Sequence, residues 1–400
     1  MKHNLLLAAL LFAMPALLSG AEPESFVITK SVSENPTISF AGLPSQPELD
    51  RELRSILGAC GWFDVVPEKG QYELKAAVAG NAVRLDLTLG GAPAGSWKLP
   101  LNASARTLAK QAVDAIIEKS FAALKVRRFC SSKIAFCAET QPGVRNIFLC
   151  DIDGGDVRQL TSYRTLCVEP AWFPNGRSVV YSKYNRSGMD VLETRLSPHM
   201  TRRLTGFRGI NAGAAISPDG KSLAVILSPD HKVDLYVIAV ASGRRTRLTK
   251  GIAVEASPCW SPDGQQIVYV SDETGNPRLF ICSRNGGSKR RLPSIGRDAV
   301  TPDWSKEGKI VYAAKVDGNY TVAVYDPATG ENKRVTTAPG NWESPAWAAD
   351  GRQVVCKRMD GGRSALYVID TWTGRTRKLL STSHNLSMPA WSPCAINREK

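Results

Sequence analysis

Histidine is scarce in this chain of 400 residues, which contains four, and the sequence has neither a Gly-x-Ser-x-Gly elbow nor a Cys-x-x-Cys pair. Serine hydrolases of the α/β class place their nucleophile in that elbow, so this class is excluded. The missing pair and the lack of a Cys/His cluster argue against a zinc site. We therefore expect no metal, no cofactor and no enzymatic activity.

Long apolar runs are also lacking after the first twenty residues. A helix that crosses a bilayer needs about 20 apolar residues, so no membrane span is expected. Residues 1–21 combine Lys2, a leucine-rich stretch and small residues before Glu22. This is the pattern of a cleaved secretory signal peptide, which predicts an exported, soluble protein.

One sequence pattern returns six times between about residues 131 and 394. Each unit has a marker residue, in most units a Trp two residues after a proline, followed by a tight turn and short β-rich runs. The markers are spaced by 44, 44, 44, 43 and 44 residues and are Trp172, Ile216, Trp260, Trp304, Trp347 and Trp391. Such a period is typical of propeller blades, each of them a four-stranded sheet. Recurring proline and glycine exclude a helical repeat.

The phase of the repeat predicts how the ring closes. No Pro-x-Trp unit precedes Ile134, and too few residues follow Trp391 to complete another blade. We expect residues 388–393 to form the inner strand of the blade whose other strands come from about 133–161. Closure of this kind removes the exposed edge of a linear array. The prediction for residues 129–400 is a six-bladed β-propeller closed by a C-terminal inner strand.

Residues 22–128 are expected to form a small N-terminal α/β domain with an extended N-terminal segment. Ser45-Gln46-Pro47-Glu48 has the pattern of a capping box before a helix, and a second helix is expected at about 105–124. Alternating apolar residues predict strands at 62–66, 72–78 and 83–89.

The net charge of +14 is concentrated on the predicted propeller. Residues 22–128 carry 13 basic and 12 acidic residues, whereas the remainder of the mature chain carries 37 and 25. Fourteen basic residues recur at the start of each blade's outermost strand, where cations deter pairing between sheet edges. The alternative is a surface for anionic lipid or polysaccharide. Nucleic acid is not an expected partner, because no stacking aromatics are interleaved with these residues.

The chain has nine cysteines, an odd number for an exported protein. Cys150, Cys282 and Cys356 occupy apolar strand positions of the repeat and are predicted to be small core residues. One or two disulfides can form among the others, although spacing does not reveal the pairing: Cys60, Cys130, Cys137, Cys167, Cys259 and Cys394.

In the absence of catalytic residues, recognition is the predicted function. Loops that lead into the inner strands meet at one mouth of a propeller, where a partner can be held from several sides. The candidate mouth residues are Val168, Glu169, Ile210, Asn211, Gly213, Glu255, Ala256, Asp298, Val300, Asn341, Trp342, Glu343, Asn385 and Leu386. Trp342 is either an anchor for a partner or a residue packed between blades.

The chain as a whole resembles the TolB family, the periplasmic propeller proteins of the Tol-Pal system. The resemblance rests on the ending Met388-Pro389-Ala390-Trp391-Ser392-Pro393, on Glu52-Leu53-Arg54 with Trp62-Phe63-Asp64, and on Arg128 followed by Ile134-Ala135-Phe136. Two positions depart from the family pattern, because Ile210 stands where the family has His and Ala214 where it has Pro.

The resemblance implies a non-enzymatic periplasmic adaptor for outer-membrane integrity and for envelope constriction at cell division. A monomer is expected separately, because a closed ring offers no obvious edge for a dimer. The resemblance implies that the mouth binds the peptidoglycan-associated lipoprotein Pal, with other outer-membrane proteins as further partners. It also implies that the N-terminal segment binds the inner-membrane protein TolA, through Glu22, Phe26, Val27, Ile28 and Thr29. Two alternatives stay open, namely a propeller that binds anionic polysaccharide or lipid through its basic edges and a non-catalytic relative of propeller peptidases.

Overall fold

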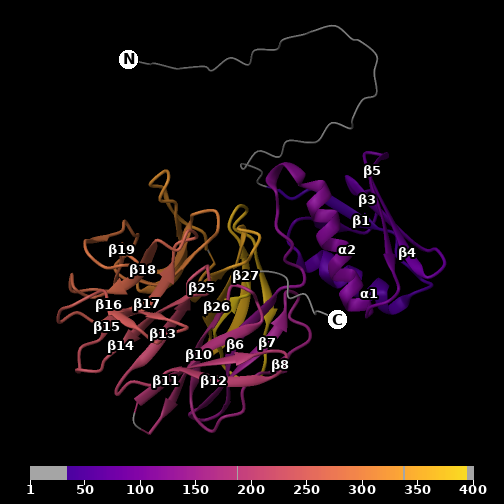
Figure 1. Ribbon diagram of the computed structural model, residues 1–400. Helices are drawn as coiled ribbons and strands as arrows, with labels where there is room; N and C mark the ends of the chain where they lie inside the picture. Colours follow the sequence, from indigo (N-terminus) through magenta and orange to yellow (C-terminus); the bar gives the residue numbers. More distant parts are fainter. Residues whose placement is uncertain (1–33, 187, 337, 394–400) are drawn as a thin grey trace, which may run out of the picture.

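The computed structural model describes residues 34–186, 188–336 and 338–393 (Figure 1). A five-stranded sheet with two helices is followed by six four-stranded sheets. Each inner strand of these sheets contacts the inner strands of both neighbours, so that the six sheets form a closed ring. The predicted fold class, an α/β domain followed by a six-bladed propeller, is confirmed. The predicted signal peptide and residues 22–33 lie outside the described residues.

The α/β domain has the strand order β2-β1-β3-β4-β5, and β1 runs parallel to both of its neighbours. Apolar residues of both helices recur every three or four positions, so each helix buries one face against the sheet. The elements are β1 (Thr37–Phe40), α1 (Pro47–Ala59), β2 (Asp64–Val66), β3 (Tyr72–Val78), β4 (Ala82–Leu89), β5 (Ala92–Pro100), α2 (Ala105–Ser120) and the short 3-10 helix η1 (Ala122–Leu124).

Two details of this domain differ from the prediction. Helix α1 begins after Gln46, whose side chain makes no capping bond, so the predicted capping box at Ser45 does not form. Strand β5 is absent from the prediction because Pro93, Gly95 and Pro100 lower its β propensity. It forms as an edge strand paired only with β4, and an edge tolerates such residues because its outer side needs no partner.

The six propeller sheets are numbered here as blades 1 to 6, each from its innermost to its outermost strand. Blade 1 consists of β29 (Leu386–Trp391), β6 (Lys133–Gln141), β7 (Val144–Asp151) and β8 (Arg158–Gln159); blade 2 of β9 (Cys167–Trp172), β10 (Ser178–Asn185), β11 (Gly188–Arg195) and β12 (Met200–Thr205); and blade 3 of β13 (Asn211–Ile216), β14 (Ser222–Leu227), β15 (Asp234–Ala239) and β16 (Arg245–Arg247). Blade 4 consists of β17 (Glu255–Trp260), β18 (Gln266–Ser271), β19 (Arg278–Ser283) and β20 (Lys289–Arg291); blade 5 of β21 (Ala299–Trp304), β22 (Ile310–Val316), β23 (Asn319–Tyr325) and β24 (Asn332–Arg334); and blade 6 of β25 (Asn341–Trp347), β26 (Gln353–Asp360), β27 (Arg363–Asp370) and β28 (Thr376–Leu380).

Strand β29 closes the ring as predicted, because it pairs antiparallel with β6 in blade 1. Trp391 is buried there, and its indole N–H donates to the Ser132 hydroxyl at 2.7 Å. The indole N–H of Trp172 reaches the carbonyl of Ala390 in the neighbouring blade at 3.0 Å, and Trp260 repeats this contact with Ala215. Two of the marker tryptophans, Trp172 and Trp260, thus link neighbouring inner strands by a hydrogen bond.

The turns after the inner strands use their aspartates internally. In blade 3 the Asp219 carboxylate accepts the Ser217 hydroxyl and the Lys221 backbone N–H, at 3.0 Å for the latter. The bond from Ser217 lowers the pKa of Asp219, and Ser261 does the same for Asp263 in blade 4. These carboxylates therefore act as turn-forming groups, which agrees with the interpretation of the Pro-Asp-Gly repeats as tight turns.

The α/β domain lies beside blades 6 and 1 (Figure 1), at the end of the ring where the inner strands finish. We call this the domain end and the other the open end. A buried charge cluster joins the parts in blade 1, where Asp151 is fully buried and forms ion pairs with Arg106, Lys110 and Lys133, each at 2.6 Å. In blade 6 the Arg352 guanidinium lies over the rings of both Trp62 and Trp372, 4.8 and 4.6 Å from their centroids.

The closing contact can be tested with Trp391→Ala, using Trp260→Ala as a control of equal size inside the ring. Both should lose about 3–5 kcal/mol of unfolding free energy, since each leaves a large cavity. Only Trp391→Ala should also accelerate amide hydrogen exchange selectively in β29 and β6, because it weakens the strand that joins the two ends of the array. Identical exchange patterns in the two variants would contradict this role of β29.

The charge cluster predicts a pH-dependent effect for Asp151→Asn. The variant leaves Lys110 buried without its counter-ion, while Lys133 keeps Asp156, so the unfolding free energy at pH 7 should fall by about 3–5 kcal/mol. Burial alone raises the pKa of Asp151, but Lys110 and Lys133 outweigh it and hold that pKa below its usual value. The stabilisation is therefore present above the ordinary Asp pKa and disappears as the pH falls through the lowered one.

Urea unfolding at pH 7 and at successively lower pH measures this difference. The matched control is Asp86→Asn, which removes a largely exposed carboxylate paired with Arg84 and should change stability little. A constant difference between wild type and Asp151→Asn down to the lowest pH would show that charge is not the cause.

Candidate functional site around the central channel

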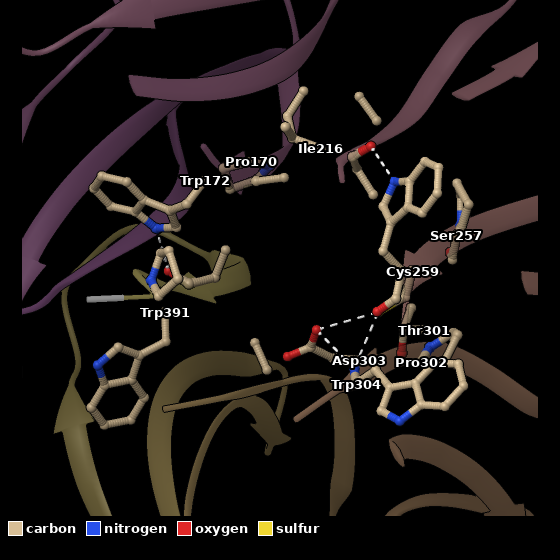
Figure 2. A pocket seen from close by; sticks show the side chains of 18 of the residues that line it. Pro170, Trp172, Ile216, Ser257, Cys259, Thr301, Pro302, Asp303, Trp304 and Trp391 are labelled. Carbon is tan, nitrogen blue, oxygen red and sulfur yellow. Dashed lines mark hydrogen bonds between the residues drawn. The ribbon is translucent and has the colours of Figure 1, made fainter. Parts of the chain in front are cut away.

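The inner strands of all six blades enclose a cavity of about 750 Å³. Figure 2 shows Trp172, Pro170 and Trp391 on one side of it and Cys259, Asp303 and Trp304 on the other. At the domain end the lining includes Arg127 from the segment that joins the two domains. The cavity is therefore a channel that begins beside the α/β domain.

Every inner strand carries a β-bulge three residues before its marker. The residue at this position has a positive φ in all six blades and faces the cavity: Glu169 (56°), Gly213 (60°), Ser257 (47°), Thr301 (48°), Ser344 (51°) and Met388 (49°). A left-handed conformation is unusual for any residue other than glycine, and most of all for β-branched Thr301. Strain of this kind concentrates at functional surfaces, which supports the channel and its rim as the candidate site.

Two carboxylates tie neighbouring blades together across the bulges. The Glu169 carboxylate accepts the backbone N–H of Gly213 at 2.8 Å and the hydroxyl of Ser182 at 2.9 Å. The Asp303 carboxylate accepts the backbone N–H of Trp347 at 2.7 Å and the thiol of Cys259 at 3.6 Å (Figure 2). Both side chains thus satisfy polar groups that the bulges leave out of the ladder.

The channel chemistry does not resemble a catalytic site. Burial, with a further contribution from the Asp303 charge, raises the pKa of Cys259 far above its usual value, so that this thiol stays protonated and is a poor nucleophile. Burial likewise raises the pKa of Asp303. Within the described residues, no group of three or more His, Cys, Asp or Glu side chains is placed to hold a metal ion. None of the helices in those residues is long and apolar enough to span a membrane.

The structure corrects the expectation that the candidate mouth residues lie in loops. Asn211, Glu255, Trp342 and Leu386 each lie five residues before a marker, at or next to the start of an inner strand, and are at most 3% exposed. Val168 is buried as well. Each inner strand begins earlier than the Pro-x-Trp signal indicates, which moves these residues from the loop into the packing between blades.

The other candidates divide between the channel and the open end. Glu169 and Gly213 line the cavity. Ala256, Val300, Asn341 and Glu343 lie in inner strands and are partly exposed, while Ile210, Asp298 and Asn385 lie in the loops before the strands.

Trp342 is packed between blades, the second of its two predicted roles. Its side chain is 1% exposed, and its indole N–H donates to the Ala338 carbonyl at 3.0 Å. The ring meets Tyr367 edge-on at 5.4 Å, and the Arg358 guanidinium covers it at 5.1 Å. A partner therefore cannot contact this indole unless blade 6 rearranges.

Glu255 is buried, and its pKa lies so high that a large share of its carboxyl groups is protonated near pH 7. It is 3% exposed, and burial raises its pKa to about 7, an effect that the bond from Ser271 only partly opposes. Among the described residues its Oε2 atom has no hydrogen-bond partner, and neither has the hydroxyl of the nearby Tyr269. A carboxyl group in this setting is a packing residue that tolerates charge poorly.

The channel residues that the sequence analysis missed are Ser257, Cys259, Thr301, Asp303, Ser344 and Met388. The repeat shows that these residues lie at fixed distances before the markers, either three residues or one. It does not reveal the bulge, however, and the bulge decides which side chains face the cavity.

The cysteines are free in the described residues. Cys150, Cys282 and Cys356 are buried, as predicted for core positions. Five of the six disulfide candidates, Cys60, Cys130, Cys137, Cys167 and Cys259, also carry free thiols. Cys394 lies outside the described residues.

The fold and the channel together define a two-domain propeller protein whose central cavity is lined by strand bulges and small side chains. Residues 124–395 match the TolB beta propeller domain, and the chain belongs to this family. The Tol-Pal system protein TolB of Desulfosudis oleivorans is 30% identical over 86 residues, which are 18% of this chain and 19% of that protein. The match thus spans about a fifth of the relative's length.

Solved structures confirm the architecture. TolB from Acinetobacter baumannii superposes with a TM-score of 0.79 at 20% identity, covering 90% of this chain and 97% of that one. The putative TolB from Agrobacterium tumefaciens gives a TM-score of 0.52 at 19% identity, covering 62% of this chain and 89% of that one. At these identities the likeness establishes the shared fold.

The buried carboxyl group predicts that Glu255→Gln is more stable than the wild type at alkaline pH. Because the folded state raises the pKa to about 7, it binds this proton more tightly than the unfolded state, and wild-type stability falls as the pH rises between about 4.5 and 7. At pH 8 the variant should gain up to about 3 kcal/mol over the wild type, and at pH 5 far less. Denaturation at both pH values, with the exposed Glu331→Gln as control, measures the gain. An equal gain in unfolding free energy at the two pH values would refute the raised pKa of Glu255.

Proposed function

We propose that this protein is a non-enzymatic adaptor of the Tol-Pal system. In this proposal the open end of the propeller binds a Pal-like lipoprotein, and the N-terminal segment binds a TolA-like inner-membrane protein. The observation that carries it is the match of residues 124–395 to the TolB propeller, together with a D. oleivorans relative that is named a Tol-Pal system protein. The proposed location is the periplasm and the proposed state a monomer, with other outer-membrane proteins as further partners.

The arrangement of the domains suits an adaptor. The α/β domain contacts the domain end through Asp350, Arg352 and Arg375, so it leaves the loops of the open end uncovered. Asn35 follows directly after the proposed N-terminal binding segment and bonds to the Gly61 carbonyl at 3.1 Å, at the junction of the domains. Two partners could therefore be held at opposite ends without competing for the same surface.

The contact surface in this proposal is the exposed part of the candidate mouth. Asn385, Asp298 and Ile210 stand in its loops, and Glu343 and Asn341 border them. The buried candidates Asn211, Glu255, Trp342 and Leu386 position these loops and do not reach the partner. Glu343 is held by Lys357 at 2.9 Å, which fixes its carboxylate at the rim.

The distribution of the edge cations weighs against polysaccharide binding through the blade edges. Twelve of the fourteen side chains lie on the outermost strands of the six blades and two, Arg244 and Arg375, directly precede such a strand, so they surround the ring and do not gather on one surface. The twelve are Arg158, Arg202, Arg203, Arg245, Arg247, Lys289, Arg290, Arg291, Lys333, Arg334, Arg377 and Lys378. Several are paired within the chain, as Arg202 is with Glu193 at 2.5 Å and Arg375 with Asp64 at 2.7 Å. Protection of sheet edges accounts for their placement.

Titration calorimetry with the soluble domain of the same organism's Pal-like lipoprotein tests the proposal. The wild type should bind at both low and moderate salt. Asn385→Arg places a bulky cation in the open-end rim and should weaken binding about tenfold or more, because it disturbs packing at the contact. Asn285→Arg makes the same change in a domain-end turn and should bind like the wild type. No binding by the wild type would contradict the proposal.

The second contact is tested by deleting residues 22–33. The deletion should leave binding of the lipoprotein domain unchanged, because those residues precede the junction at the other end of the ring. It should abolish binding of the TolA-like domain. Undiminished TolA-like binding would remove the N-terminal segment from the proposal.

A further inference from the structure

Four exposed apolar side chains stand together at one part of the open end. Tyr184, Ile210, Ile252 and Val254 are 40%, 36%, 100% and 49% exposed. They make up half of the eight large hydrophobic side chains that are exposed in the described part of the chain. We call these four residues the apolar arc. A single exposed apolar side chain is common on protein surfaces, but four of them on neighbouring blades at one end of the ring, one fully exposed, make a candidate contact surface.

The arc spans consecutive loops of blades 2, 3 and 4. Tyr184 lies at the end of β10, Ile210 directly before β13, and Ile252 and Val254 in the loop before β17. All of these positions are at the open end, because they precede inner strands or follow second strands. The four side chains therefore project from one face of the ring, away from the α/β domain.

The loops that carry the arc are fixed by hydrogen bonds. The Ile210 backbone N–H donates to the Ser228 hydroxyl at 2.8 Å, and the Ser228 N–H returns a bond to the Ile210 carbonyl at 3.1 Å. The Val254 N–H donates to the Asp272 carboxylate at 2.8 Å. Gly188 and Gly209 let the neighbouring loop approach, since a Cβ on Gly188 would lie 2.3 Å from the Gly209 carbonyl oxygen. Hydrogen bonds thus hold the backbone at Ile210 and Val254, two of the four positions of the arc.

Five cations surround the arc without a counter-ion. Within the described residues no ion pair involves these side chains: Arg164, Arg186, Arg208, Lys232 and Lys250. Of the acidic side chains in the same region, Asp230 pairs with Arg247 at 3.2 Å and Asp190 with Arg203 at 4.0 Å, whereas Asp272 accepts only the Val254 N–H at 2.8 Å, so five cations face one carboxylate without a paired cation. The arc therefore presents net positive charge.

The opposite part of the open end, on blades 5 and 6, has a different character. There Lys315 and Arg297 both face Asp298, at 3.8 and 4.0 Å, and Lys357 pairs with Glu343. Among the described residues of that half, no large hydrophobic side chain is exposed. The combination of apolar tips and unpaired cations is thus confined to blades 2–4.

We propose that the apolar arc is a membrane-docking surface for a leaflet rich in anionic phospholipid. Apolar side chains flanked by Lys and Arg are the composition of interfacial membrane anchors, in which the apolar part enters the acyl boundary and the cations meet the headgroups. The apolar tips stand on separate loops with cations between them. A fluid lipid surface accommodates such separate tips, whereas a protein partner would need a matching pocket for each.

Docking of the arc goes beyond binding of a protein partner, because it orients the whole molecule. The open end would face the lipid, and the α/β domain would point away from it. A lipid-anchored protein would then meet the propeller rim in the plane of its own membrane. The two contacts share Ile210 but otherwise use different parts of the same face, so variants at Ile252 and at Asn385 measure them separately.

Co-sedimentation of the mature full chain with vesicles tests the proposal. The wild type should bind vesicles of equal phosphatidylglycerol and phosphatidylcholine, bind far less to pure phosphatidylcholine, and lose affinity as salt rises. Ile252→Ser should lower the affinity about tenfold, since one buried aliphatic side chain is lost from the lipid. Met200→Ser is the matched control, because Met200 is 51% exposed at the domain end and should be unaffected.

The electrostatic part is tested by Arg208→Gln combined with Lys250→Gln, against Arg244→Gln combined with Arg290→Gln on the blade edges. The first pair should weaken binding to anionic vesicles about tenfold or more, and the second pair should not. Loss of binding in the edge pair alone would overturn the assignment in favour of the blade edges.

Other outcomes also overturn it. If the wild type does not sediment with anionic vesicles, or if Ile252→Ser binds them as the wild type does, the arc is not a lipid contact. If vesicle binding is absent while Ile252→Ser weakens binding of the lipoprotein domain, the arc is a protein contact instead. Near-ultraviolet circular dichroism of each variant confirms that these surface changes leave the fold intact.

Discussion

Contact between neighbouring inner strands is the constraint on which the propeller depends. A blade has an apolar inner region that it cannot bury alone, and the marker indoles of Trp172 and Trp260 fill the space to the next blade and bond to its backbone. Every blade has a packing neighbour on both sides only if the last inner strand lies beside the first blade and closes the ring. Strand β29 therefore pairs with β6, and residues near the end of the sequence complete a sheet that begins about 250 residues earlier.

The same inner strands determine how the acidic side chains of the channel are used. Each bulge forces one residue into a left-handed conformation, and the ladders on both sides hold it there. The freed backbone N–H groups need acceptors, which Glu169 and Asp303 supply between blades. These acidic side chains are thereby occupied in structural bonds. An acidic residue facing a channel is not by itself evidence of a site, because its hydrogen bonds decide what it can do.

Periodicity made the architecture predictable. Six markers at nearly constant spacing indicated the number of blades, and their phase indicated the closing strand, because both follow from one repeated packing unit. The site was less predictable. Trp342 and Glu255 share the loop-like position before Pro-x-Trp, yet both are buried, because the inner strand starts before the visible motif. Ile252 carries no motif at all, and its full exposure depends on a loop whose position only the assembled ring determines.

Location, more than net charge, decides what the basic residues of this protein do. At the domain end Arg106, Lys110 and Lys133 surround Asp151 and join two domains through buried charge. On the blade edges cations are spread around the ring, where they oppose association of sheets. At the apolar arc five of them stand without counter-ions in the described part of the chain, beside four exposed apolar side chains. An anionic lipid leaflet offers negative headgroups for these cations and an acyl region for the exposed apolar side chains, so it suits both features of the arc.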